Sequence, residues 1–513
     1  MFVFLWSCED DIEKLDTESE QALLTEEEAT SLLLLKESNT ISFEEAAKEA
    51  MEFASYLDEI DPQVNGRMRH RNIQNSQRVT IKGFSETVNG RVSEVDSLTI
   101  AYVFNFSGSN TEENGYVVMS GDERVPGIYT YAFEGAVGDT VYDPGLSFFF
   151  GNLEGFVRTE IEKFNQYYDS ILTDAVAKLV ASLPDSVLDE LDTTGNGRLK
   201  LNEPCLSLAR MKNTEDERCL SIYTTTSTHY SSWSTIENKG PFINVRWNQG
   251  DDWDPYNDSA YVNDYIYYMT GEKRLCSNGR YIPVGCGPVA VAQIASFHEH
   301  PNAMDGITYN WNGLTSQPRV NWSANPDLRS QVACLMRSVG ERVKVSWECD
   351  GGSGTDRDDI NQGMKAMGYN ISSKHSYNSN SIKNNLRNEQ IPVLIAGYSF
   401  RERKGLWPFR RWDHSRGHYF VIDGYKKRKR TKTTTVRTYD SYSRLLSTIT
   451  YRSTEYNEFW HCNMGWGESS STTWYVPGVF DTKNPPSNAR ITKEGSEYYY
   501  RYKMEIWYNI WPN

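Results

Sequence analysis

Residues 281–301, YIPVGCGPVAVAQIASFHEHP, decide the fold of the larger part of this chain. A glycine on each side of Cys286 leaves the backbone free to turn, and Pro288 suits the first turn of a helix. The residues that follow are small and apolar, so the helix is expected to be buried. At the start of that helix, the positive end of the helix dipole favours the thiolate form of Cys286. An ordinary buried cysteine fits the same residues, so this segment alone leaves both interpretations open.

A nucleophilic cysteine needs a base, and the sequence has eight histidines. His418 begins the run HYFVIDGY directly after Gly417, and alternation places His418 and Phe420 on one face of a predicted strand. A rigid strand can hold an imidazole against the start of a helix at little cost in entropy. His418 is therefore the predicted partner of Cys286, and His414, in the charged stretch before it, is the alternative.

A third polar residue is expected to orient the imidazole. Residues 459–468, FWHCNMGWGE, offer Asn463 for this position, followed closely by Trp466. His461 in the same stretch also fits an ordinary strand histidine.

Four segments in this order resemble the streptopain family of papain-fold cysteine proteases. They are WNQG at 247–250, the cysteine segment at 281–301, GHYFVIDGY at 417–425 and WHCNMGWGE at 460–468. His418 follows Cys286 by 132 residues, within the roughly 130 to 150 residues seen in papain-like enzymes. The resemblance implies an α+β fold, in which a papain-like catalytic domain combines a helical part with an antiparallel sheet or barrel.

The resemblance also implies a role for each matching residue. Cys286 is expected to be the nucleophile, and His418 the general base and later the general acid. Gln249 is expected to donate a hydrogen bond to the oxyanion, with Asn463 and Trp466 near the imidazole. These roles define a thiol endopeptidase that cleaves protein or peptide substrates through an acyl-enzyme.

Substrate contacts are expected from Ser353, Gly354, Gly417 and Trp466. Ser353 and Gly354 belong to DGGSGTD, which resembles a glycine-serine wall of the family's substrate cleft. Exposed backbone there could pair with an extended peptide. A simple flexible turn is the alternative.

Residues 20–205 are expected to form a separate α+β unit. A capping box at Ser42 and Glu45 precedes a helical pattern, and period-two alternation between 79 and 141 predicts an antiparallel sheet. Helical composition returns after Phe148. Residues 115–135, GYVVMSGDERVPGIYTYAFEG, resemble the family's propeptide, which implies an inactive zymogen whose own propeptide binds in cis.

The remaining boundaries follow from composition. Residues 206–238, rich in serine, threonine and charge, are expected to be an exposed linker that is cut on activation. Residues 239–513 form the predicted peptidase domain.

Residues 1–19 are expected to be a truncated signal and tether. Leu5, Trp6, Ser7 and Cys8 fit a bacterial lipoprotein cleavage pattern, although a basic start and a full apolar region are lacking. The interpretation is a secreted, cell-surface or outer-membrane lipoprotein with a lipid anchor at Cys8, and a frayed chain end is the alternative. No apolar run approaches the roughly 20 residues that a membrane-spanning helix needs.

Eight cysteines without CxxC spacing argue against structural zinc, and neither a metal nor a cofactor is expected. Cys205 and Cys219 lie close enough to close a disulfide loop in an exported protein. Residues 192–203 resemble an incomplete calcium loop with Thr194 at its third position, and a Gly-Asn turn explains them equally well.

The net charge of the chain limits the kinds of molecule that it is expected to bind. The chain carries 53 basic and 69 acidic residues, a net charge of −16, which argues against nucleic acid as a partner. Against this background, KKRKR at 426–430 is expected to be a solvated hairpin tip, or else a docking site for an acidic substrate.

One departure from the family pattern bears on activity. Met464 stands where relatives carry a tryptophan, which puts the shielding of His418 and the primed subsites in question. A catalytically inactive papain-like protein that binds peptides or inhibits proteases is therefore the alternative function. Transpeptidation or amidase action would use the same residues.

Overall fold

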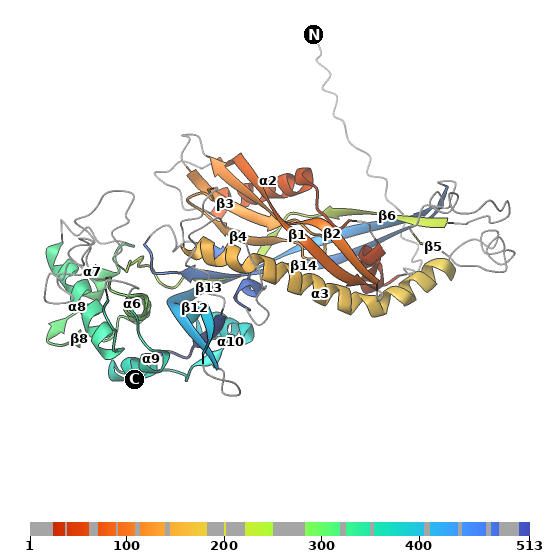
Figure 1. Cartoon of the computed structure of the whole chain (residues 1–513). Coiled ribbons are helices and arrows are strands. Elements are labelled where there is room, and N and C mark those ends of the chain that lie inside the picture. Colours follow the sequence, from red (N-terminus) through yellow and green to blue (C-terminus); the bar gives the residue numbers. More distant parts are fainter. Residues whose placement is uncertain are drawn as a thin grey trace, which may run out of the picture. The chain divides into compact units, whose positions relative to one another are not determined.

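The fold is described from a computed structural model of the chain (Figure 1). The residues that it describes are 24–35, 38–60, 70–88, 91–107, 113–138, 144–181, 200–201, 221–249, 283–318, 325–348, 353–404, 411–439, 444–467, 473–481 and 502–513. The chain contains both helices and a large, mainly antiparallel sheet, which confirms the predicted α+β class.

The helical elements are α1 (Glu26–Ser31), η1 (Leu32–Leu35), α2 (Phe43–Ile60), α3 (Pro144–Ala181), α6 (Cys286–His298), α7 (Trp311–Leu314), α8 (Pro326–Arg342), α9 (Arg357–Ala366), α10 (Ser379–Asn384), η3 (Asn385–Glu389) and η4 (Pro477–Phe480). The strands are β1 (Asn72–Val88), β2 (Arg91–Ser107), β3 (Glu113–Ser120), β4 (Ile128–Ala132), β5 (Lys200–Leu201), β6 (Ser221–Tyr230), β7 (Ser234–Lys239), β8 (Ala303–Met304), β9 (Ile307–Thr308), β10 (Tyr369–Asn370), β11 (His375–Ser376), β12 (Val393–Lys404), β13 (Arg411–Tyr439), β14 (Leu445–Asn463), β15 (Thr473–Tyr475), β16 (Tyr502–Trp507) and β17 (Trp511–Pro512).

One large sheet joins strands from both ends of the chain. Its order is β1-β2-β3-β4-β15-β14-β13-β12-β16-β11. The amino-terminal meander β1 to β4 therefore continues directly into strands of the predicted peptidase domain. The connection is the antiparallel pairing of β4 with β15.

Side-chain bonds reinforce this β4–β15 junction. Tyr131 lies opposite Trp474 in the register. The Thr130 hydroxyl donates to the Trp474 carbonyl at 2.8 Å, and the Val476 N–H donates to the Tyr129 carbonyl at 2.8 Å. Because these groups are buried, breaking the junction would leave polar atoms without partners.

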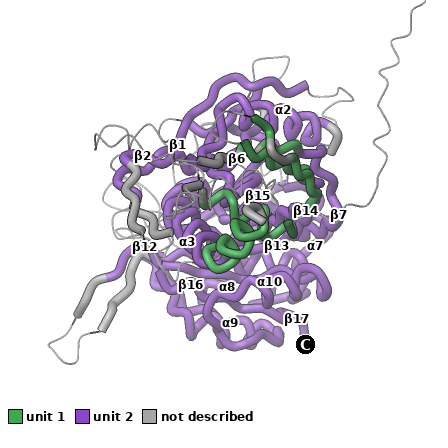
Figure 2. The backbone as a smooth tube through the Cα atoms, turned by 90° about the vertical axis from the view of Figure 1, so that its right-hand side faces the viewer, with its two compact units in different colours: residues 1–36, 168–229, 432–453 green, residues 37–167, 230–431, 454–513 purple. Residues whose placement is uncertain are grey.

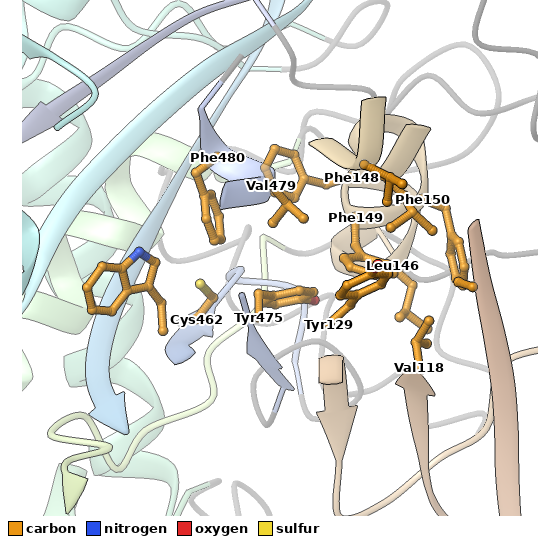
Figure 3. Packing of buried hydrophobic residues seen from close by; sticks show 14 of the residues in the cluster. Val118, Tyr129, Leu146, Phe148, Phe149, Phe150, Cys462, Tyr475, Val479 and Phe480 are labelled. Atoms are coloured by element: carbon orange, nitrogen blue, oxygen red, sulfur yellow. The ribbon is translucent and has the colours of Figure 1, made fainter. Parts of the chain in front are cut away.

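Period-two alternation in β2 and β3 produces two apolar faces. One face, with Tyr102, Phe104 and Val117, packs with α2. The opposite face packs with the start of α3, where Figure 3 shows Phe148 and its neighbours close to residues that follow β14. β2 and β3 are thus covered on both faces.

A second hydrophobic core lies among the helices of the peptidase part. Residues of α6 pack with residues of α8 and with strand residues, including Val291, Leu335 and Val421. Every residue of α6 from Cys286 to Ser296 is buried, which confirms the buried helix predicted from its composition.

The described chain divides into two compact units, coloured in Figure 2. The smaller one takes residues from 1–36, 168–229 and 432–453. Its apolar cluster is built from Leu24, Ala29, Leu32, Leu172, Ala175 and Val436. Glu28 and Lys178 form an ion pair at 2.6 Å beside it. The larger unit holds Cys286, His418 and Asn463.

The KKRKR segment is not a solvated hairpin tip, and that expectation is wrong. It lies inside the long strand β13, and Lys426, Arg428 and Arg430 are only 3%, 1% and 4% exposed. Aromatic rings cover these three side chains. The side chain of Lys429, on the other face, is exposed.

Part of the predicted linker also differs from expectation. Residues 221–230 and 234–239 form strands β6 and β7, and β7 pairs with β13. The side chains of β7 are nevertheless largely exposed. The domain limits and the cleavage position stay predictions.

Several predicted features lie outside the described residues. They are the lipoprotein pattern with Cys8, the calcium-like loop apart from residues 200–201, and the cysteine pair Cys205 and Cys219. Among the described helices, none combines the length and apolar character needed to cross a membrane.

Replacing Gly115 with alanine is expected to weaken the β3–β4 contact. Gly115 has a φ of 90°, and a methyl group there would lie 2.2 Å from the Ala132 carbonyl oxygen. Gly135 is a matched control, because its φ is 77° but a methyl group would meet nothing within 4 Å. Both changes cost about 1 to 2 kcal/mol of backbone strain. In urea unfolding, Gly115→Ala should cost about 1 to 3 kcal/mol beyond Gly135→Ala, and equal midpoints would contradict the close β3–β4 approach.

Candidate active site

Cys286 is the first residue of α6, as the glycine pattern predicted. Gly285 caps the helix with a φ of 95°, a conformation that residues with a side chain rarely adopt. A methyl group at Gly285 would also lie 2.9 Å from the Ser353 carbonyl oxygen. The local backbone therefore requires glycine in front of this cysteine.

The Cys286 thiol lies beside the strand that carries His418. Backbone hydrogen bonds from Tyr419, Cys286 and Gly287 lower the thiol pKa, but burial raises it more, so its pKa lies above the usual value. Tyr419 directly follows His418 in β13. The start of α6 thus lies next to the strand that carries His418, and the raised pKa favours the thiol form of the sulfur. A catalytic pair of Cys286 and His418 stays a prediction.

His418 is buried in β13, opposite Gly397 of β12, and only 2% of it is exposed. Its Nε2 lies 2.9 Å from the Met464 carbonyl oxygen. A carbonyl can only accept, so this contact puts the proton on Nε2 and leaves Nδ1 as the basic nitrogen. Burial lowers the His418 pKa to about 4, with a smaller opposing effect of the Met464 bond. The imidazole is therefore neutral at neutral pH.

Aromatic rings enclose the imidazole. The indole N–H of Trp466 is directed at His418 Nε2 at 3.3 Å, with the two rings 5.8 Å apart. It could donate to Nε2 only in the other tautomer, so the shorter 2.9 Å contact with the Met464 carbonyl decides the proton position. Phe420 stacks against His418 at 5.9 Å. Met464 is itself buried, and its carbonyl contacts the imidazole, so the missing tryptophan leaves His418 shielded.

Asn463 is the last residue of β14 and directly precedes Met464. Its side-chain amide makes three hydrogen bonds. Its Oδ1 accepts from Gln293 Nε2 at 2.8 Å and from the Gly465 N–H at 3.2 Å. Its Nδ2 donates to the Val245 carbonyl at 2.9 Å. These bonds fix the backbone on both sides of Met464, whose carbonyl meets His418.

Sequence reasoning missed Gln293. It is fully buried in α6, seven residues after Cys286, and it ties that helix to Asn463. The signal was present, because residues seven apart share one face of a helix. A lone amide in the apolar run AVAQIAS needs a buried partner.

Gln249 is positioned by a backbone bond to the segment that leads into α6. Its carbonyl accepts from the Val284 N–H at 2.8 Å. Its side chain is buried, and Nε2 has no hydrogen-bond partner among the described residues. A buried unpaired amide donor is costly in the resting protein, which makes it available for an acceptor that arrives later.

The predicted substrate residues fall into two groups. Ser353 lies directly against Gly285, and its hydroxyl donates to the Pro283 carbonyl at 2.5 Å. Gly354 has open space where a side chain would stand, and it bridges to Ser346. Gly417 is exposed at the start of the buried part of β13, while Trp466 pairs with Asn248. Contact with a substrate stays a prediction for all four.

The two other histidines near this site lie at other strand positions. His461 Nδ1 lies 2.6 Å from Asp423 Oδ1, so it is a buried strand histidine. His414 lies on β13 opposite Arg401 of β12. The described residues contain no group of three or more histidine, cysteine or acidic side chains that could hold a metal.

A thiol at the start of a buried helix, beside a strand that carries a buried imidazole, is an arrangement that cysteine hydrolases use. Residues 247–475 match the Peptidase C10 family. The chain is also 22% identical over 350 residues to streptopain of Streptococcus pyogenes, an alignment that covers 63% of this chain and 67% of streptopain. These matches make the chain a cysteine-type peptidase, and the resemblance to the streptopain family is confirmed.

Two solved structures are similar at lower levels. A prointerpain A fragment from Prevotella intermedia is 13% identical with a TM-score of 0.40, covering 86% of this chain and 100% of the fragment. Active interpain A from the same organism is 17% identical with a TM-score of 0.30, covering 53% of this chain and 95% of its own. At these scores the likeness adds nothing to the sequence match.

Acidification is expected to destabilise the chain through His418. Its folded pKa of about 4 lies below the ordinary value of 6.5, so the unfolded chain binds the proton first. Stability therefore falls as the pH drops from about 6.5 to about 4, by about 3 kcal/mol for this residue. In urea unfolding at pH 7 and pH 4, His418→Gln should lose about 3 kcal/mol less than the unchanged chain.

His375→Gln is the matched control, because His375 is exposed. It should follow the unchanged chain at both pH values. If His418→Gln also loses as much stability as the unchanged chain, the buried neutral imidazole is refuted.

Proposed function

We propose that this chain is the zymogen of a cysteine endopeptidase that cleaves protein substrates through an acyl-enzyme at Cys286. The observation that carries the proposal is the position of the Cys286 thiol, bonded to the backbone beside His418. The open oxyanion donor Gln249 supports the same chemistry.

The proposed reaction has two stages, formation of an acyl-enzyme and its hydrolysis. His418 Nδ1 takes the thiol proton, and the sulfur attacks the peptide carbonyl carbon. The N–H of Cys286 and Gln249 Nε2 stabilise the oxyanion, each worth about 3 to 4 kcal/mol. His418 then gives its proton to the leaving amine, and water, activated by His418, releases the acid from the thioester.

Asn463 acts through the loop that it holds. Its bonds to Gln293 and the Gly465 N–H support the Met464 carbonyl, which accepts from His418 Nε2. That bond keeps Nδ1 unprotonated in the resting pair and stabilises the imidazolium during the reaction. Asn463 and Gln293 are thus positioning residues.

The amino-terminal segment holds the enzyme in its resting state. Its strand β4 extends the peptidase sheet through β15. Phe148 of α3 packs on Phe420 at 5.9 Å, and Phe420 in turn stacks on His418. This apolar packing withdraws water from the imidazole, which keeps it neutral. Removal of the segment would rehydrate His418 and favour the ion pair with Cys286.

Export with a lipid on Cys8 is a second, separate proposal. It is supported by the sequence Leu5-Trp6-Ser7-Cys8 alone. Growth of a bacterial host with radiolabelled palmitate should label the expressed chain, and Cys8→Ser should abolish the label. Equal labelling of both chains would exclude Cys8 as the anchor.

The peptidase proposal is tested by cleavage of a fluorogenic peptide after the amino-terminal segment is removed. Cys286→Ala should reduce turnover by about 10³-fold or more, and a thiol alkylator should have the same effect. Cys334→Ala is the control, because Cys334 lies on α8 and is half-exposed. Its turnover should be unchanged.

Turnover that survives in Cys286→Ala would overturn the assignment. Absence of turnover in the unchanged chain, together with no labelling of Cys286 by an epoxide inhibitor, would identify an inactive peptide-binding protein. Product analysis separates hydrolysis from transpeptidation, because only the latter joins the acyl group to a second amine.

A further inference from the structure

A buried row of cations runs along one face of β13. Lys426, Arg428 and Arg430 alternate with Lys427 and Lys429, and the first three are almost fully buried. Burying a cation is costly unless it is paired and hydrogen-bonded. The carboxylates, carbonyls and aromatic rings around each cation therefore decide whether its burial stabilises or destabilises the fold.

The buried charge of Arg430 is paired with two carboxylates. Its Nη1 lies 2.5 Å from Glu49 of α2, and its Nε lies 2.8 Å from Glu455 of β14. The guanidinium also stacks on the Tyr230 ring at 3.7 Å. The Glu49 carboxylate additionally accepts from the indole N–H of Trp233 at 3.1 Å. Glu49 thus joins α2 to β13 and to the segment before β7.

The buried charge of Arg428 has ring contacts and one hydrogen bond but no carboxylate partner among the described residues. Its guanidinium lies 3.8 Å from the Tyr56 ring and 4.9 Å from the Phe53 ring, both on α2. One nitrogen donates to the Trp233 carbonyl at 3.3 Å. Its Nε and Nη1 have no hydrogen-bond partner among the described residues. Stacking on rings returns about 1 to 2 kcal/mol, less than the usual cost of buried unpaired charged donors.

Arg428 and Arg430 contact one face of a single helix, whereas Lys426 bonds Tyr131 of β4 and lies over the Trp474 ring of β15. Glu49, Phe53 and Tyr56 follow each other at spacings of four and three residues, so they project from the same side of α2. The helix is secured at its start by Ser42 and Glu45, which bond to each other's backbone N–H groups. Tyr56 also bonds Thr235 of β7 at 2.8 Å.

We propose that Arg428 and Arg430 on this face of β13 form a docking site for α2 that helps to hold the amino-terminal segment on the peptidase domain after the linker is cut. This inference rests on the proposed zymogen function and specifies its regulation. Activation then has two steps, cleavage of the chain and release of α2. The Arg430–Glu49 pair opposes release, and Arg428 favours it, because release returns its unpaired donors to water.

Two substitutions should therefore change the release rate in opposite directions. Glu49→Gln removes the charge that pairs with Arg430 and keeps an acceptor for Trp233, so release should become about 10-fold faster. Arg428→Met keeps the apolar stem but removes the buried charge, so release should become about 3-fold slower. Lys429→Gln is the control, since Lys429 has the same charge on the exposed face of the same strand.

The experiment uses the full chain carrying Cys286→Ala, with the recognition sequence of a site-specific protease inserted after residue 210. After cutting, the two fragments stay together, and their dissociation is followed by size-exclusion chromatography in urea below the unfolding transition. Thermal unfolding of each uncut variant verifies that it is folded. The expected order of release is Glu49→Gln fastest, then the unchanged chain together with Lys429→Gln, and Arg428→Met slowest.

The proposal is overturned if Glu49→Gln releases no faster than Lys429→Gln. It is equally overturned if Arg428→Met releases as fast as the unchanged chain, or if the cut fragments separate at once. Because the chain tested carries no nucleophile, these results do not depend on peptidase activity. A chain that retains α2 but never cleaves a peptide would sink the proposed function and leave the docking site standing.

Discussion

The pairing of β4 with β15 is the constraint on which the larger unit depends. Three residues of each strand join the amino-terminal meander to the peptidase sheet. Once this junction forms, α2 and the start of α3 cover the two faces of one continuous sheet. The aromatic packing around Phe420 follows from it, and so does the dry environment of His418. The burial of His418 is thus tied to the continuity of the sheet.

Burial shifts both members of the pair toward their neutral forms. It raises the thiol pKa of Cys286 and lowers the imidazole pKa of His418. A nucleophilic ion pair needs the opposite shifts. The helix dipole and three backbone N–H groups are in place to favour the thiolate, but they are outweighed while the site is dry. Cys286 and the strand of His418 therefore lie together while both groups are neutral, and the proposed activation requires their charge state to change.

The sequence revealed the elements that carry chemistry and missed how they are supported. Glycines around Cys286 and alternation after His418 predicted a helix start and a strand correctly, because those patterns are local. The acceptor for His418 Nε2 is the backbone carbonyl of Met464, and a carbonyl has no signature in a sequence. The burial of KKRKR was also hidden, because both faces of that stretch carry cations. Rings from distant parts of the chain, on α2, β6 and β15, distinguish one face from the other.

The pH dependence of Cys286 alkylation tests the central claim most directly, in the intact chain and after release of the amino-terminal segment. In the intact chain the rate should rise only above the ordinary thiol pKa of about 9, because burial keeps the sulfur protonated. After release, the midpoint should fall below about 7, as for a thiolate beside an imidazolium. A low, identical midpoint in both forms would contradict the claim that the amino-terminal segment keeps the pair neutral.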